Sequence, residues 1–189
     1  MLKIIMLWTI WLIIVLVALL VVMFVYYFNK FVLLSNRIDN SLSQIDVQLR
    51  RRADLVPNLI NTVKGYAKHE KGIMDSVTKA REAMMSAKDI VGKVKAGNVL
   101  ESALGRLFAI AENYPQLKAN ENFMQLQQEL ASIEDKVAYS RQFYNDSILD
   151  YNNSVGVFPG ILFARIFGKS HKEFLQIPEA QRAVPKVEF

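Results

Sequence analysis

The sequence contains no cysteine, and among its 189 residues there are only eight glycines, five prolines and two histidines. The absence of cysteine excludes disulfides, thiolate metal sites, a thiol nucleophile and thioether lipidation. Attachment to a membrane must therefore come from the protein chain itself. The shortage of glycine and proline argues against an all-β domain, which needs many turns.

The patterns that carry common catalytic chemistry are missing as well. His69 and His171 lie far apart, and neither has the Glu or His spacing of a helical di-iron site or a zinc protease. There is no Gly-x-Ser-x-Gly elbow and no glycine cluster to hold a phosphate. We therefore expect no catalytic residue, no metal site and no cofactor, and hence a protein that is not an enzyme. The balance of 23 basic against 18 acidic residues also lacks the one-sided excess of a nucleic-acid binder.

Residues 4–28 form an uncharged, strongly apolar run. As a helix this run is ~37 Å long, enough to cross a hydrocarbon core of ~30 Å with some tilt. It is too long for the apolar region of a signal peptide, which has ~7–15 residues. Aromatic residues near its two ends suit the two membrane interfaces. These residues are Trp8 and Trp11 at one end and Tyr26 and Tyr27 at the other.

The charges that flank the run predict its orientation. Lys3 precedes it, whereas Lys30 and Arg37 follow it, and further arginines come later. Because positive residues favour the cytoplasmic side, we expect the N-terminus outside and the C-terminal domain in the cytoplasm. The run holds no charge and no pair of small residues at four-residue spacing, which is typical of an anchor and not of a pore or relay.

After the run, apolar residues follow helical spacing. A seam of the coiled-coil type comprises Ile38, Leu42, Ile45, Leu49, Val56, Leu59 and Val63, with Arg52 at the skipped position. Pro57 predicts a kink or break near residues 54–57, with Asp54 capping a restarted helix. Further helices are predicted over residues 70–95, 99–113 and 121–155. Ala96-Gly97-Asn98 would stop the first of these, an extended link would cover 115–119, and Asn120 would cap the last.

These patterns predict an all-α protein. A single N-terminal transmembrane helix is followed by a long antiparallel four-helix bundle. The expected domains are the anchor at 1–28, a cytoplasmic bundle at 29–158, and a C-terminal amphipathic segment and tail at 159–189.

Arg50, Arg51 and Arg52 form a basic triplet that could contact an anionic lipid or a protein partner. Consecutive helical residues splay over about 200°, so the three side chains do not form one patch. Arg52 falls on the apolar seam, where it needs a carboxylate from another helix. Structural, partner-docking and lipid roles remain open for this triplet.

The tail contains a second apolar segment. Pro159-Gly160 interrupts the fourth predicted helix, and residues 161–167 are apolar except Arg165. In an antiparallel bundle this segment lies near the bilayer, where Phe163 and Phe167 would sit in an anionic interface. Alternatively, the open end of the bundle would be capped by Ile161, Leu162, Phe163 and Phe167.

Long motifs in the chain resemble the LemA family of bacterial membrane proteins. The resemblance is carried by residues 36–70 (NRIDNSLSQIDVQLRRRADLVPNLINTVKGYAKHE), 78–81 (TKAR), 112–120 (ENYPQLKAN), the pairs Tyr144-Asn145 and Tyr151-Asn152, Phe158-Pro159, and 184–189 (VPKVEF). Ser41-Leu42 and Phe174-Leu175 depart from the family's usual Ala-Trp and Tyr-Phe. The resemblance implies an N-terminal membrane helix, a cytoplasmic helical bundle and no established catalytic residue.

The family's frequent gene company with membrane metalloproteases suggests such a protease as a protein partner, and a role in envelope quality control or stress response. The leading hypothesis is thus a non-catalytic scaffold or adaptor in a bacterial inner membrane. The alternative is a protein that organises or remodels membranes by acting directly on lipid. Under both hypotheses the lipid bilayer is a partner, nucleic acid is not, and a homo-oligomer is an open alternative.

Overall fold

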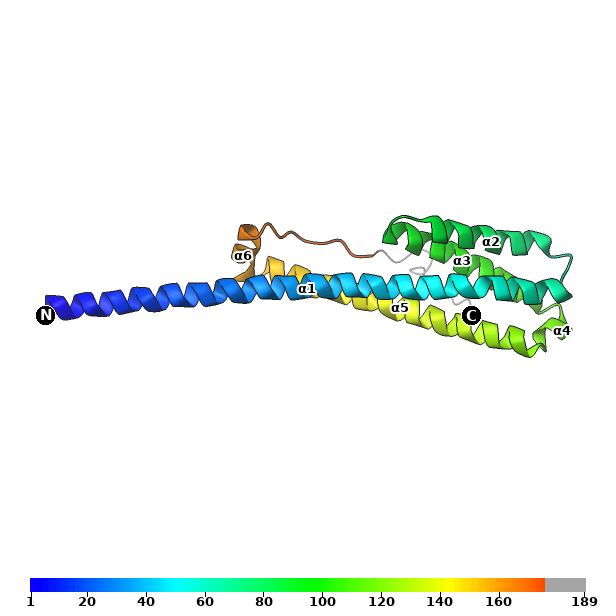
Figure 1. Ribbon diagram of the computed structural model, residues 1–189, viewed down its shortest axis with the longest axis horizontal. Helices are drawn as coiled ribbons and strands as arrows, with labels where there is room; N and C mark the ends of the chain where they lie inside the picture. The colour runs from blue at the N-terminus through cyan, green and yellow to red at the C-terminus, as the bar shows by residue number, and fades with distance from the viewer. Residues whose placement is uncertain (176–189) are drawn as a thin grey trace, which may run out of the picture. The chain divides into compact units, whose positions relative to one another are not determined.

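A computed structural model describes residues 1–175. This part of the chain is all-α and has no strand, which confirms the predicted fold class (Figure 1). The helices are α1 (Leu2–Tyr66), α2 (Lys71–Ser86), α3 (Ile90–Ala111), α4 (Pro115–Lys118), α5 (Glu121–Gly156) and α6 (Gly160–Ile166). The chain divides into two compact units, and α1 and α5 each contribute to both. Unit 1 contains Met1–Asp39 and the chain from Tyr144 onward, and unit 2 contains Asn40–Phe143.

Unit 2 is an antiparallel four-helix arrangement. It consists of the C-terminal stretch of α1, then α2, α3 and the N-terminal stretch of α5, with the single turn α4 between α3 and α5 (Figure 1). Most of the predicted seam of α1 is buried here, with Ile45 and Leu59 fully inaccessible to solvent, whereas Leu42 is only half-buried. Leu100 of α3 and Ile133 of α5 are also almost completely buried. Burial of such a side chain stabilises the fold by about 1.5–3 kcal/mol, so these seams hold the unit together.

The predicted break at Pro57 is wrong, because α1 continues through it to Tyr66. Proline cannot donate the hydrogen bond that the carbonyl of Ala53, four residues earlier, would normally accept. In this protein Arg81 of α2 supplies the missing donor, with its Nε 2.7 Å from the Ala53 oxygen. The buried carbonyl thus keeps a partner, which removes one of the two costs of a proline inside a helix.

This compensation can be tested with a double-mutant cycle. We expect Arg81→Met to lower the free energy of unfolding by about 1.5–3 kcal/mol, the range for a hydrogen bond to a charged donor. In a Pro57→Ala background the new N–H of residue 57 can bond Ala53, so the same Arg81 substitution should cost less than half as much. Chemical unfolding followed by circular dichroism measures both. Equal costs in the two backgrounds would show that Arg81 does not compensate for Pro57.

The boundary between α2 and α3 also differs from the prediction. The chain breaks at 87–89, and Asp89 caps α3 by accepting a hydrogen bond from the Gly92 amide at 3.4 Å. Ala96-Gly97-Asn98, predicted as a stop, lies inside α3. A Cβ on Gly97 would lie 2.9 Å from Leu49 Cδ2, so the glycine provides close packing between α3 and α1 and does not end a helix.

Side-chain hydrogen bonds hold together the end of unit 2 at which α1 finishes and α5 begins. Asn120 caps α5 as predicted, accepting from the Phe123 amide at 3.0 Å, and its own amide donates to the Tyr66 hydroxyl. The Tyr114 hydroxyl donates to Glu70 at 3.0 Å, and this bond raises the pKa of Tyr114. The link at 115–119, predicted to be extended, instead contains the single turn α4, with Pro115 at its first position, where a missing N–H costs nothing.

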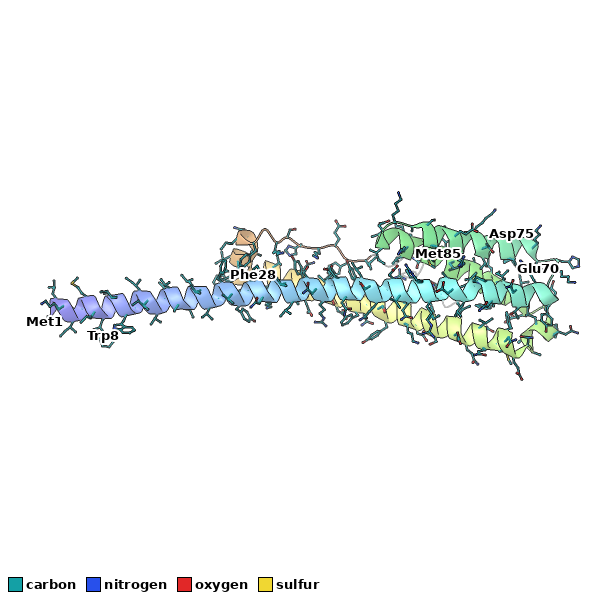
Figure 2. The ribbon with its side chains drawn as sticks, viewed as in Figure 1. Met1, Trp8, Phe28, Glu70, Asp75 and Met85 are labelled. Atoms are coloured by element: carbon teal, nitrogen blue, oxygen red, sulfur yellow. The ribbon has the colours of Figure 1, made fainter. Side chains whose placement is uncertain are left out.

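Unit 1 begins with the apolar part of α1. Its side chains are exposed, including Trp8 at 73% and Trp11 at 64%. Figure 2 shows Met1 and Trp8 on this stretch, directed away from the helix. Among the described residues, α1 is the helix that is long and apolar enough to cross a membrane. An apolar surface of this kind needs a non-aqueous surrounding.

Candidate functional site

Helix α6 packs one of its faces on α1 within unit 1 (Figure 1). The rings of Phe163 and Tyr27 stack in parallel, 4.9 Å apart between centroids. Phe167 meets Phe24 edge-on at 4.8 Å, and it also contacts Phe28, which is labelled beside α6 in Figure 2. We call this packed set of rings the aromatic collar: Phe24, Tyr27, Phe28, Phe31, Phe163 and Phe167.

The collar shows where the structure places the predicted interface residues of the tail. Phe163 is buried and Phe167 is half-buried, so both side chains contact α1. The inner face of α6 therefore packs on α1, as the capping interpretation predicts for these two residues. Its outer face exposes Leu162, which the capping interpretation places inside, together with Ile166. Val157 and Phe158, in the chain between α5 and α6, are exposed as well.

A strap of extended chain, residues 169–175, runs along α5 in unit 1 and was not predicted. The side-chain amide of Asn152 both accepts from the Lys172 amide at 2.8 Å and donates to its carbonyl at 2.9 Å. Asn145 brackets Leu175 in the same way. Asn145 and Asn152 are seven residues apart on a helix, and their partners Leu175 and Lys172 are three residues apart in extended chain. Both separations are about 10 Å, so each asparagine lies opposite its partner.

The basic triplet is spread over unit 2, as its helical spacing predicts. Arg52 is 2% exposed and pairs with Glu134 of α5, which confirms the predicted carboxylate partner. Arg50 and Arg51 are exposed, and Arg50 lies 4.0 Å from Asp46. Partner or lipid contacts of Arg50 and Arg51 remain predictions.

A second arginine accompanies Arg52. Arg141 of α5 is half-buried, and its Nη1 donates to Asn98 at 3.3 Å. Burial lowers the pKa of both guanidinium groups, and the nearby Glu101 carboxylate acts in the opposite direction. Glu101 and Glu134 border a pocket of about 240 Å³ together with Arg52. This charge cluster, defined as Arg52, Arg141, Glu101 and Glu134, joins α1, α3 and α5.

A larger groove lies between α1 and α5 in unit 2. We call it the polar groove; its volume is about 710 Å³. Its lining residues are Gln44, Gln48, Gln128, Ala131, Ser132, Asp135, Lys136, Tyr139 and Ser140. The Gln48 Oε1 atom is buried and has no hydrogen-bond partner among residues 1–175. A buried oxygen without a donor costs about 1–3 kcal/mol, so a donor that reaches Gln48 Oε1 would bind favourably there.

The profile of the LemA family matches residues 41–189, which is most of the chain. The chain belongs to the LemA family. This confirms the resemblance in the sequence motifs, and with the apolar stretch of α1 it makes the protein a membrane-associated helical member of that family.

Curated relatives of this LemA-family chain include two magnetosome proteins. Magnetosome protein MamQ 2 of Paramagnetospirillum magneticum is 26% identical over 175 residues, which cover 79% of this chain. MamQ of Magnetospirillum gryphiswaldense is 26% identical over 173 residues, or 78% of the chain. Protein LemA of Metamycoplasma hominis is 26% identical over 138 residues, or 71% of the chain. The matches span 64% of the length of the two MamQ proteins and 63% of that LemA protein.

The motifs that carry the family resemblance have structural tasks in this chain. Arg81 bonds the carbonyl that Pro57 leaves free, and Asn120 caps α5. Asn145 and Asn152 hold the strap through backbone bonds. These polar residues are thus engaged in hydrogen bonds that shape the helices and hold the strap.

Proposed function

We propose that this LemA-family chain is a non-catalytic scaffold that holds a protein partner next to a bacterial inner membrane. One observation carries the proposal: amide side chains of two helices line the polar groove, and one buried amide oxygen there lacks a donor among the described residues. A partner helix with a hydrogen-bond donor would satisfy Gln48 Oε1 and fill the groove. Amide-lined grooves favour specific pairing because each unmatched polar group is costly.

The proposed topology places the N-terminus outside and unit 2 in the cytoplasm. The excess of basic residues after the apolar run supports it, since Lys30 and Arg37 follow closely. The resemblance to the LemA family suggests a membrane metalloprotease as the partner, with a role in envelope quality control or stress response. Such a partner would be confined to the same membrane, which raises its effective concentration at the groove.

Site-specific photo-crosslinking tests the scaffold proposal. A photoreactive residue at Gln44, Gln128 or Tyr139 should form a discrete adduct with one membrane protein in native membranes. The control positions are Lys79 and Glu82, which are also exposed but lie on α2, outside the groove. The same adducts at groove and control positions, or no discrete adduct in the groove, would refute the proposal.

Substitution of Gln48 separates binding from stability. Gln48→Leu removes the unpaired oxygen, so we expect the isolated protein to gain about 1 kcal/mol of stability. The same change should weaken the groove adduct, because the partner's donor then faces an apolar side chain. Thermal unfolding and adduct yield measure the two effects. A variant that loses stability would show that Gln48 serves the fold and not a partner.

The exposed outer face of α6 favours a second candidate function, direct action on lipid. Full-length protein incubated alone with liposomes tests it by electron microscopy. Deformation of the vesicles without any added partner would support remodelling, whereas unchanged vesicles would leave scaffolding as the function.

A further inference from the structure

Helix α6 has two apolar faces, and only one of them is covered within the described residues. The inner face contributes Phe163 and Phe167 to the aromatic collar. The outer face exposes Leu162 at 51% and Ile166 at 66%, and Phe158, in the turn that precedes the helix, is 79% exposed. Leu162 and Ile166 lie four residues apart on α6, so they form a single stripe along one face of the helix. A contiguous apolar stripe on a surface marks an interaction site.

We infer that the occupant of this stripe is the lipid bilayer, and that α6 lies in the membrane interface as a lateral foot beside the anchor. The inference rests on where α6 is docked. Phe24 and Phe28, its contacts on α1, belong to the apolar run that spans the membrane. Because Phe167 lies 4.8 Å from Phe24 between ring centroids, α6 cannot be far from the depth of that ring.

The depth of α6 is the same for either orientation of the protein in the membrane. Whichever side of the membrane holds the soluble part, residues 24–28 end the apolar run and must lie at the boundary between acyl chains and headgroups. A helix packed on these residues has one face toward α1, and its opposite face meets the surrounding lipid. The outer stripe would thus be exposed to acyl chains and not to water.

The charges near the collar fit the same placement. Lys30 Nζ lies 5.9 Å from the Tyr27 ring centroid, just beyond the apolar run. Arg165 and Lys169 are exposed on and just after α6. Basic side chains beside an apolar stripe are typical of interfacial helices, whose apolar face enters the acyl region while the charges contact anionic headgroups.

The foot has a consequence for the anchor. A transmembrane helix without a lateral element can slide and tilt in response to bilayer thickness. A second apolar element docked at residues 24–31 would resist movement of the anchor in either direction, since sliding would pull the stripe into water or drive the basic residues into hydrocarbon. The foot therefore sets the depth at which α1 leaves the membrane.

The absence of native cysteine allows a direct test with single spin labels. Full-length Leu162→Cys and Ile166→Cys proteins are labelled and reconstituted in mixed phosphatidylcholine and phosphatidylglycerol vesicles. Collision with oxygen, which concentrates in lipid, is compared with collision with a water-soluble nickel chelate. The matched control is Asp146→Cys, an exposed position on α5 in the same unit. It lies fourteen residues before the start of α6, about 20 Å at the rise of a helix.

We expect the oxygen-to-nickel collision ratio at 162 and 166 to exceed that at 146 several-fold. A ratio at 162 and 166 equal to that at 146 would place the stripe in water and overturn the inference. Low collision rates with both reagents would show that protein covers the stripe, a second copy or another chain, and would also overturn it. If one labelled variant does not fold, as judged by its helicity, the other gives the same answer.

Discussion

Replacing Arg52 with alanine is expected to lower the free energy of unfolding by about 3 kcal/mol, the lower end of the range for breaking a buried ion pair. Arg52 is 2% exposed, and its removal leaves Glu134 without its partner and a cavity at the seam. The estimate stays at the lower end because the Glu134 side chain is 35% exposed and can be hydrated. Arg50→Ala and Arg51→Ala, at exposed positions, should each change stability by less than about 0.5 kcal/mol.

A fourth variant shows which part of Arg52 matters. Arg52→Met keeps much of the apolar stem but removes the charge together with its desolvation cost. It should therefore lower the free energy of unfolding much less than Arg52→Ala does. Chemical unfolding of all four variants in detergent, followed by circular dichroism, gives the comparison. Equal and small effects at 50, 51 and 52 would mean that Arg52 is solvated in solution and that the charge cluster is not a buried network.

Gly160→Ala is expected to undock α6. A Cβ at this position would lie 2.2 Å from the carbonyl oxygen of Ser154 and 3.2 Å from Tyr27 Cε1, and the first of these contacts is with backbone. Such overpacking costs about 1–3 kcal/mol, which is enough to favour the detached state of a helix this short. Detachment should accelerate tryptic cleavage at Arg165 and Lys169 while the overall helicity stays nearly constant.

The control for this prediction is another glycine. Gly105 lies inside α3, and no atom approaches within 4 Å of the position that a Cβ would occupy there, so alanine meets no obstacle. Gly105→Ala should therefore stabilise α3 by about 0.5–1 kcal/mol, the difference in helix propensity, and leave cleavage after α6 unchanged. If Gly160→Ala behaves like Gly105→Ala, then α6 does not pack as closely on the end of α5 as the structure shows.

The helical architecture follows from the sequence because helix formation and seam burial are set by local spacing. Residues three and four apart share a helix face wherever they occur. That rule located most of the buried positions of α1 between Ile38 and Val63. The preference of asparagine for helix N-termini placed the cap of α5 at Asn120. The spacing also required a carboxylate for Arg52, since a charge on an apolar seam must be paired.

What the spacing could not determine is how proline and glycine act, because their effect depends on neighbours distant in sequence. Pro57 does not break α1, since Arg81, 28 residues away from Ala53, bonds the carbonyl that the proline frees. Gly97 does not end a helix, since Leu49 packs where its side chain would be.

The same distinction applies to the candidate sites. The sequence identified an apolar segment after Pro159 and a carboxylate requirement at Arg52, because composition and spacing carry both. Only the tertiary structure decided that Phe163 stacks on Tyr27 while Leu162 faces outward, and that Glu134 is the partner. The physical reason is that a helix's own periodicity defines its faces, whereas the choice of what each face contacts is made by the packing of chain segments that lie far apart in the sequence.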